Sequence, residues 1–260
     1  MGRLPLISDA LFWYYCYVSK TTNPPQLFNY VGFPNYSGIG RGYFANMQQL
    51  GGVRPEHDVL DVGCGIGRVA IHYTEFLHAE SRYEGFDVVK KGPQWCSEKI
   101  GRRFPNFSFC HANVYNKHYN RRGAISASAY RFPYENESFD FVFATSVFTH
   151  MLPDAIGQYL SEIERVLRPG GRAFLSYFLL NDMSRKHMVT SEFNFQRVDD
   201  RYGVMSENDP EAAIAFDESF IRQLHDDNGI PVLLPIHYGD WSGCRGVTGG
   251  QDVLVAEKAR

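Results

Sequence analysis

The chain has 260 residues, of which 44% are hydrophobic and 15% are aromatic. That composition is enough for a sizeable buried core and excludes disordered and fibrous proteins. The 26 basic and 29 acidic side chains leave a formal charge of −3. This balance lacks the basic excess of proteins that bind a phosphate backbone, so we predict no nucleic-acid partner.

The N-terminal stretch from Leu4 to Val18 is conspicuously apolar but contains Asp9. About 15 residues are too few to cross a bilayer, which needs roughly 20, so we predict no integral membrane segment. The stretch also lacks the basic start and cleavage site of a secretory signal. We expect a helix from Ala10, capped by Ser8 or Asp9, that packs on the main domain. Contact with a membrane surface or a partner, through the aromatic residues at positions 12 to 15 and 17, is the alternative.

The rest of the chain alternates between strand-like and helix-like segments. Residues 21–42 are rich in Pro, Asn and Gly and predict an irregular loop, followed by a helix over 43–50. Periodicity then predicts strands over 57–63, 81–89, 107–114, 138–148, 171–180, 231–238 and 251–257. Helices are expected over 67–78, 92–103, 154–167 and 217–225, the third ended by Pro169-Gly170-Gly171. Such alternation indicates an α/β fold with a mostly parallel sheet covered by helices on both faces.

Residues 181–214 break this alternation, because they are polar and aromatic without a clear period. We interpret them as an inserted lid or hairpin between the fifth and sixth strands. The expected organisation is therefore an N-terminal segment, residues 1–50, that packs on or caps the site, and a main domain over residues 51–260.

The most informative segment is VLDVGCGIGR, residues 59–68, in which a strand leads through a glycine-rich turn into a helix. Glycines at positions 63, 65 and 67 allow the backbone to approach a ligand closely. Asp61, two residues before the first glycine, would repel the diphosphate of a dinucleotide at this turn. Asp87 ends the next strand, where a carboxylate can accept hydrogen bonds from ribose hydroxyls. A nucleoside with a cationic group in place of phosphate, such as S-adenosylmethionine, fits this pattern.

These motifs also carry a family resemblance over roughly residues 53–180. In chain order they are VLDVGCGIGR, GFDVV, CHANV, FDFVFATSVFTHM and RVLRPGGRAFL. Their order and spacing resemble those of class I S-adenosylmethionine-dependent methyltransferases, in particular the small-molecule branch. The resemblance implies a Rossmann-like, mostly parallel seven-stranded sheet and a reaction that releases S-adenosylhomocysteine.

Matched position by position, the resemblance implies a set of cofactor-binding residues. Asp61 and the turn with Gly63, Cys64, Gly65 and Gly67 would hold the methionine end, with Arg68 or Arg41 near its carboxylate. Asp87 would bind the ribose, and Val88 would pack on the adenine. Asn113 would meet the adenine amino group, where many relatives carry an acid, and Val114 would supply its backbone. Thr145 and Ser146 would line the mouth through which the methyl group is transferred.

Methyl transfer from a sulfonium needs a base only if the acceptor must lose a proton. His150, after the fourth strand, and His237 are the candidate bases. Aromatic residues at positions 193, 195, 202 and 241 suggest a pocket for a small, partly apolar acceptor, or else part of the core. Oxygen, nitrogen and carbon acceptors all stay open. The absence of an N-P-P-Y or D-P-P-Y tetrad argues against methylation of nucleobase amino groups.

Two other functions fit parts of the pattern. A nicotinamide-dependent oxidoreductase is disfavoured by G-x-G-x-G in place of G-x-G-x-x-G and by Asp61. A non-catalytic nucleoside-binding module is the second alternative, although such modules usually lose the glycines and acids kept here. The sequence does not indicate an oligomeric state.

The cysteines and histidines give no pattern for a metal or a disulfide framework. The five cysteines are widely spaced without a C-x-x-C pair, and the nine histidines form no H-x-H or H-x-x-x-H pair. This spacing fits neither a zinc site nor paired disulfides. We therefore expect a reduced, cytoplasmic protein without a bound metal.

Overall fold

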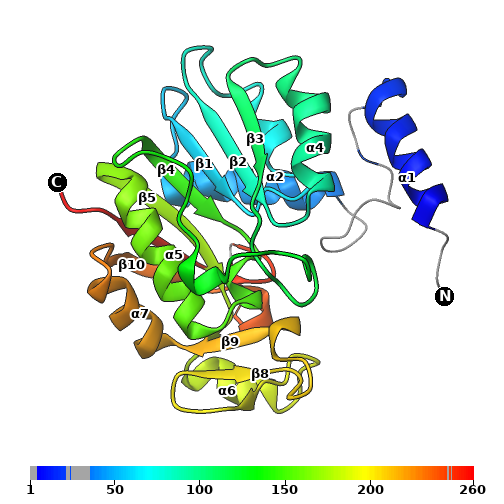
Figure 1. Cartoon of the computed structure of the whole chain (residues 1–260). Coiled ribbons are helices and arrows are strands. Elements are labelled where there is room, and N and C mark those ends of the chain that lie inside the picture. Colours follow the sequence, from blue (N-terminus) through cyan, green and yellow to red (C-terminus); the bar gives the residue numbers. More distant parts are fainter. Residues whose placement is uncertain (1–4, 22–23, 25–35, 245, 247) are drawn as a thin grey trace.

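The computed structural model describes residues 5–21, 24, 36–244, 246 and 248–260, and is built around a seven-stranded sheet (Figure 1). The strands in spatial order are β10 (Val232–His237), β11 (Asp252–Glu257), β5 (Leu167–Tyr177), β4 (Phe139–Ala144), β1 (Val59–Val62), β2 (Tyr83–Asp87) and β3 (Phe107–His111). The neighbours from β5 to β3 pair in parallel, whereas β11 runs antiparallel to both β5 and β10. The mostly parallel α/β sheet predicted from the sequence is confirmed.

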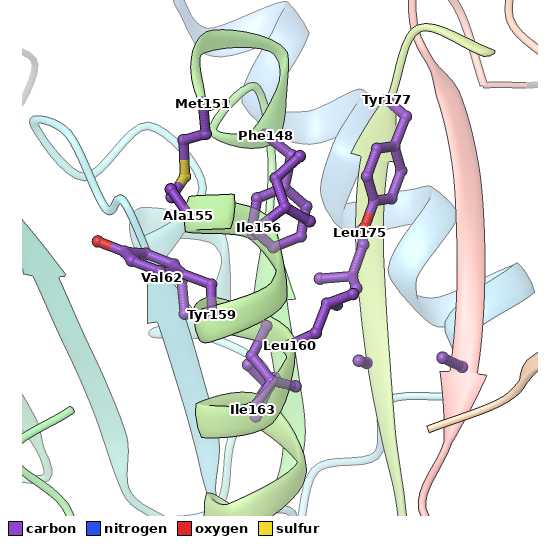
Figure 2. Close-up of a cluster of buried hydrophobic side chains, with 14 of the residues drawn as sticks. Val62, Phe148, Met151, Ala155, Ile156, Tyr159, Leu160, Ile163, Leu175 and Tyr177 are labelled. Carbon is purple, nitrogen blue, oxygen red and sulfur yellow. The ribbon is translucent and has the colours of Figure 1, made fainter. Parts of the chain in front are cut away.

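Helices cover both faces of this sheet, which explains why its central strands are apolar throughout. The helix α5 (Pro153–Val166) packs on the face that carries Leu60 and Val62. Figure 2 shows Ile156, Leu160 and Ile163 of α5 on the side of the helix near β5. α7 (Glu218–Asp227) packs in the same cluster, and α2 (Tyr36–Asn46) and α3 (Ala70–Tyr73) lie on the opposite face with Val59 and Phe143.

The N-terminal helix starts earlier than the sequence predicted. α1 spans Pro5–Trp13 and continues as a π-helical turn over Tyr14–Val18, so Ser8 and Asp9 lie inside the helix rather than at its cap. Asp9 accepts a hydrogen bond from Lys91 instead. Phe12 and Cys16 of this segment pack against Trp95 in α4 (Lys91–Cys96).

Two predicted boundaries after this helix were also wrong. The helix predicted over 43–50 begins at Tyr36, so residues 36–42 of the predicted loop are helical. Residues 22–23 and 25–35 of that predicted loop lie outside the described residues. The helix predicted over 67–78 is reduced to the single turn Ala70–Tyr73. There the hydroxyl of Thr74 donates to the carbonyl of Ile71 at 2.7 Å, a local bond that competes with helix continuation.

The Pro-Gly-Gly sequence does not separate helix from strand. α5 ends at Val166, and β5 begins at once with Leu167, which already pairs with Phe139. The register then jumps so that Phe141 pairs with Arg172. Residues 169–171 therefore form a bulge within β5, and Gly170 adopts a positive φ of 77°.

The insertion builds a small sheet of its own and uses residues 179–217, slightly more than predicted. Its strands are β6 (Leu179–Leu180), β9 (Ile214–Asp217), β8 (Tyr202–Val204) and β7 (Gln196–Arg197), with the helix α6 (Asp182–Met188) after β6. Strands β7 and β8 form an antiparallel hairpin. Phe193 and Phe195 pack with Phe178 and Trp241, and Tyr202 packs near Phe216, so these aromatic rings belong to the core and not to an acceptor pocket.

None of the helices in the described part of the chain has the length and apolar character needed to cross a membrane.

Candidate functional site

A cavity opens where strands β1, β2 and β4 end, which is the edge at which open α/β sheets bind ligands. Its wall combines the first residues after these strands with the loop after β3 and the start of α5. The lining residues are Val62, Gly63, Phe86, Asp87, Val88, Val114, Tyr115, Asn116, Tyr119, Ala127, Thr145, Ser146, Val147, His150, Met151 and Tyr159.

The glycine turn after β1 is fixed to the end of β2 by backbone hydrogen bonds. The N–H groups of Gly63 and Cys64 both donate to the carbonyl of Phe86 at 2.9 Å. Gly63 has a φ of 80°, and a Cβ atom added there would lie 2.5 Å from the Cγ2 atom of Val147. Glycine is therefore required at this position both by backbone conformation and by the close approach of the segment after β4.

Asp87 stands on the cavity wall and organises the glycine turn. Its Oδ2 atom accepts from the N–H of Gly65 at 2.8 Å, and its Oδ1 atom accepts from the N–H of Val89 at 2.7 Å. The side chain is buried, with 8% of its surface exposed, yet lines the cavity. Two backbone donors thus hold a carboxylate in one orientation beside the turn.

Asp61 lies beneath the turn and not on the cavity wall. Its Oδ2 atom accepts from the hydroxyl of Tyr83 at 2.6 Å. Burial raises the pKa of Asp61 to about 7, with a further increase from Asp87, while the Tyr83 hydrogen bond and Arg68 act in the opposite direction. The site therefore holds two carboxylates, one on the wall and one buried behind it.

Several residues predicted to bind the cofactor lie outside the cavity lining, and two of them make close packing contacts. A Cβ atom on Gly67 would meet the Sγ atom of Cys96 at 2.9 Å, so this glycine allows α4 to pack closely. The carbonyl of Arg68 faces Gly40 of α2, where an added Cβ would lie 2.1 Å away. Cys64, Gly65, Gly67, Arg68 and Arg41 are not among the residues that line the cavity.

Asn113, which the sequence predicted to meet the adenine, is not among the residues that line the cavity. Asn113 is exposed, and its Oδ1 atom accepts from the N–H of Ala124 at 3.3 Å, so the side chain closes the loop after β3. Val114, the next residue, is buried on the cavity wall. None of the described residues accepts a hydrogen bond from the Val114 N–H.

Thr145 and Ser146 follow β4 directly and lie on the cavity wall, as their position in the sequence suggested. Ser146 has a φ of 57°, which is uncommon for a residue with a side chain. Its N–H donates to the Oγ atom of Ser176 in β5 at 2.8 Å. The wall at this point is therefore held by the neighbouring strand.

His150 lies on the cavity wall in the 3-10 turn Phe148–His150. Its Nδ1 atom is 2.9 Å from the carbonyl oxygen of Glu211, which can only accept, so Nδ1 carries a hydrogen and Nε2 of the neutral ring is an acceptor. Burial lowers the pKa of His150 below 6.5, which favours the neutral ring. His237 ends the edge strand β10 and is not a lining residue, so the structure does not bring it to this site.

The sequence interpretation missed the loop between β3 and β4. This loop supplies Tyr115, Asn116, Tyr119 and Ala127, while Tyr159 comes from α5 and points away from Leu175 (Figure 2). The loop has no helical or strand period that would have attracted attention. Its available signal was two tyrosines placed directly after a strand end, where ligand-binding residues are common.

Comparison with known proteins identifies the same region as a family domain. Residues 60–175 match the methyltransferase domain family. Phthiotriol/phenolphthiotriol dimycocerosates methyltransferase 1 of Mycobacterium ulcerans is 32% identical over 125 residues, covering 48% of this chain and 37% of that protein. This chain therefore spans little more than a third of that relative. Demethylmenaquinone methyltransferase of Beutenbergia cavernae is 28% identical over 217 residues, covering 80% of this chain and 75% of that protein.

Solved structures share the fold over nearly the whole chain. The 1,6-didemethyltoxoflavin-N1-methyltransferase of Burkholderia thailandensis, solved with 1,6-didemethyltoxoflavin and S-adenosylhomocysteine, has a TM-score of 0.54 and 19% identity, covering 100% of this chain and 92% of that chain. Magnesium protoporphyrin IX methyltransferase of Synechocystis, solved with S-adenosylhomocysteine, has a TM-score of 0.54 and 15% identity, covering 97% and 100%. The predicted Rossmann-like fold is confirmed.

Proposed function

We propose that this chain, whose residues 60–175 form a methyltransferase domain of the class I S-adenosylmethionine-dependent superfamily, transfers a methyl group from S-adenosylmethionine to a small-molecule acceptor. The product of the donor is S-adenosylhomocysteine. The observation that carries this proposal is Asp87, a carboxylate fixed on the cavity wall beside the glycine turn. Asp87 is placed to accept hydrogen bonds from the ribose hydroxyls of a nucleoside. Asp61, close to the turn, disfavours a diphosphate there and favours a cationic tail.

The residues of the cavity suit the parts of this donor. Asp87 accepts the ribose hydroxyls, and the apolar side chains of Val88 and Val114 flank the adenine. The N–H of Val114 is available as a donor to a ring nitrogen. Asp61, buried behind the turn, supplies negative charge toward the cationic methionine end. When bound, the donor supplies an activated methyl group whose leaving atom becomes neutral on transfer.

The chain's own contribution to transfer is alignment, exclusion of water and, where needed, removal of a proton. Thr145 and Ser146 form the wall next to which the acceptor lies. Nε2 of His150 accepts the acceptor's proton if the nucleophile carries one, because Nδ1 is occupied by the Glu211 carbonyl. Aromatic side chains from the loop after β3 and the printed names of the relatives, which include menaquinone and phthiotriol methyltransferases, support a partly apolar acceptor.

We also propose that residues 1–50 cap the site and that the insertion over about 181–214 acts as its lid. Gly40 of α2 lies against the carbonyl of Arg68, next to the glycine turn, and Glu211 of the insertion contacts His150. All five cysteines are free thiols, which supports a reducing, cytoplasmic location.

Thermal-shift and calorimetric measurements with S-adenosylhomocysteine and with NAD test the donor. We expect stabilisation by S-adenosylhomocysteine only, and stabilisation by NAD alone would reverse the proposal in favour of an oxidoreductase. Labelled methyl groups followed from S-adenosylmethionine into cell-extract metabolites then test transfer. Cofactor binding without transfer to any extract component would support a non-catalytic nucleoside-binding module instead.

A further inference from the structure

The side-chain amide of Gln251 collects three hydroxyl donors from three different elements. Its Oε1 atom accepts from Ser176 at 2.7 Å, from Ser146 at 3.1 Å and from Tyr43 at 3.3 Å. Ser176 belongs to β5, Ser146 follows β4, and Tyr43 belongs to α2. Gln251 itself directly precedes β11, and its carbonyl accepts from the Thr248 hydroxyl at 2.9 Å. One amide oxygen therefore joins β5, the segment after β4 and the helix α2.

Ser146 is the member of this group that lines the cavity, and its conformation needs support. With a φ of 57°, its backbone occupies the left-handed region that residues with a side chain rarely adopt. Two bonds hold it there, from its N–H to the Oγ atom of Ser176 and from its own hydroxyl to Gln251. Strained backbone conformations persist only where surrounding contacts hold them in place. Both contacts of Ser146 depend on the Gln251 amide, one directly and one through Ser176.

Ser176 links the two bonds into one chain. Its side chain has no exposed surface, so its hydroxyl requires a partner for its own hydrogen. The Ser176 hydroxyl accepts from the Ser146 N–H and donates to Gln251. Because its hydrogen points at Gln251, its lone pairs are oriented toward Ser146. Removal of the Gln251 oxygen would leave this buried hydroxyl free to turn, and the Ser146 N–H would lose a fixed acceptor.

We infer that Gln251 is a positioning residue that fixes Ser146 in the cavity wall, and thereby sets how the methyl acceptor is aligned with the donor. This inference rests on the proposed function for its catalytic consequence. The structural part, the dependence of the Ser146 conformation on Gln251, stands without it. Gln251 is not among the cavity-lining residues, so its effect reaches the reacting groups through Ser146 and Ser176.

Three variants separate positioning from a general loss of stability. Gln251→Leu removes the acceptor while keeping a side chain of similar size. Gln251→Glu keeps an oxygen for the three hydroxyls, and none of the described residues accepts from the lost Nε2 group. Ser81→Ala is the matched control, because Ser81 is also a buried serine but donates to the Pro55 carbonyl, away from the cavity.

The first measurement is hydrogen–deuterium exchange of the peptide that contains Ser146, which requires no ligand. We expect faster exchange of this peptide in Gln251→Leu, near-normal exchange in Gln251→Glu and no change in Ser81→Ala. Unchanged exchange in Gln251→Leu would overturn the positioning role, whether or not the chain is a methyltransferase.

The second measurement is labelled methyl transfer into cell extract, with S-adenosylhomocysteine affinity determined in parallel by calorimetry. We expect Gln251→Leu to lower transfer about tenfold or more, as misalignment of reacting groups does, with affinity changed much less, and Gln251→Glu to restore most of the rate. Equal losses in Gln251→Leu and Ser81→Ala would assign the effect to stability and reject positioning. Failure of the unaltered protein to bind S-adenosylhomocysteine would instead reject the proposed function, and the exchange result would still decide the role of Gln251.

Discussion

The imidazole of His150 is held by the backbone carbonyl of Glu211, 2.9 Å from its Nδ1 atom, and Glu211 belongs to the insertion and not to the main sheet. The inserted unit thus decides which ring nitrogen of His150 carries a hydrogen. Nε2 is left as the acceptor of the neutral ring, the state that a general base requires. A segment that broke the strand–helix alternation of the sequence therefore contributes directly to the site.

Replacement of His150 by Gln should lower the rate of methyl transfer if the acceptor loses a proton. General bases contribute about 10²- to 10⁴-fold, and we expect a loss within that range. Burial lowers the pKa of His150 below 6.5, so the neutral base predominates at pH 7 and the rate should fall only as the pH drops below 6.5. Measurement of kcat/KM against pH for the unaltered protein and for His150→Gln checks both the size of the loss and its pH dependence. His237→Gln, away from the cavity, is the control, and an unchanged rate in His150→Gln would exclude a base at this position.

Replacement of Asp87 by Ala should weaken S-adenosylhomocysteine binding by about 1–3 kcal/mol, the usual cost of leaving hydrogen-bond partners unpaired. The variant also loses the acceptors of two backbone N–H groups, so part of the effect is a loss of stability. Asp217→Ala is the matched control, because Asp217 likewise accepts from two backbone N–H groups, of Ser219 and Phe220, but is not a lining residue of the cavity. Calorimetry that shows equal affinity in Asp87→Ala and the unaltered protein would remove the ribose assignment.

Three glycine-to-alanine variants separate backbone strain from steric contact. All three positions have a positive φ, but an added Cβ meets Val147 at Gly63, Cys96 at Gly67 and nothing within 4 Å at Gly249. Gly249→Ala should therefore cost only the conformational strain, about 1 kcal/mol of unfolding free energy. Gly67→Ala and Gly63→Ala should each lower the free energy of unfolding by more than this, because the added Cβ also meets a side chain. Gly63→Ala should in addition reduce S-adenosylhomocysteine affinity, because Val147 lines the cavity. Denaturant unfolding and calorimetry on the same samples check this order, which an equal loss in all three variants would contradict.

The main sheet was predictable because the relevant signals are local. Short apolar runs buried on both faces identified β1 and β4, and the glycine turn identified the edge at which a ligand binds. The end of β2 at Asp87 follows from the same periodicity. Residues whose positions depend only on a strand end and the next turn, such as Gly63 and Ser146, do line the cavity.

Residues whose side chains are directed by distant contacts were not predictable. The side chain of Asn113 accepts from the N–H of Ala124, eleven positions further along the chain, and does not line the cavity. Gly67 serves close packing of α4, since the partner atoms lie in Cys96 and Ile100. The pairing of His150 with Glu211 joins residues separated by 61 positions, and no local pattern in the sequence indicates it.

The buried carboxylate of Asp61 leads to a last prediction, on the pH dependence of donor binding. Burial raises its pKa from 3.8 to about 7, so a large fraction of Asp61 holds a proton at pH 6. In the free protein, the contribution of this pKa shift to the free energy of unfolding is fully present below pH 3.8. It is lost as the pH rises through about 7. A cationic methionine end near the turn favours the ionised form, so binding below pH 7 should release a proton from Asp61.

Affinity for S-adenosylhomocysteine, whose methionine end carries the same ammonium group, should therefore rise between pH 6 and pH 8, by up to about tenfold for each pH unit below the pKa. Calorimetry in buffers of different ionisation enthalpy measures the released proton directly. Asp61→Asn should bind more weakly and lose this pH dependence. The 2.6 Å hydrogen bond from Tyr83 lowers the pKa of Asp61. Tyr83→Phe removes this bond and should raise that pKa, so the rise in affinity should move to higher pH. Proton release that persists in Asp61→Asn would assign the linkage to another group and would place the ammonium away from Asp61.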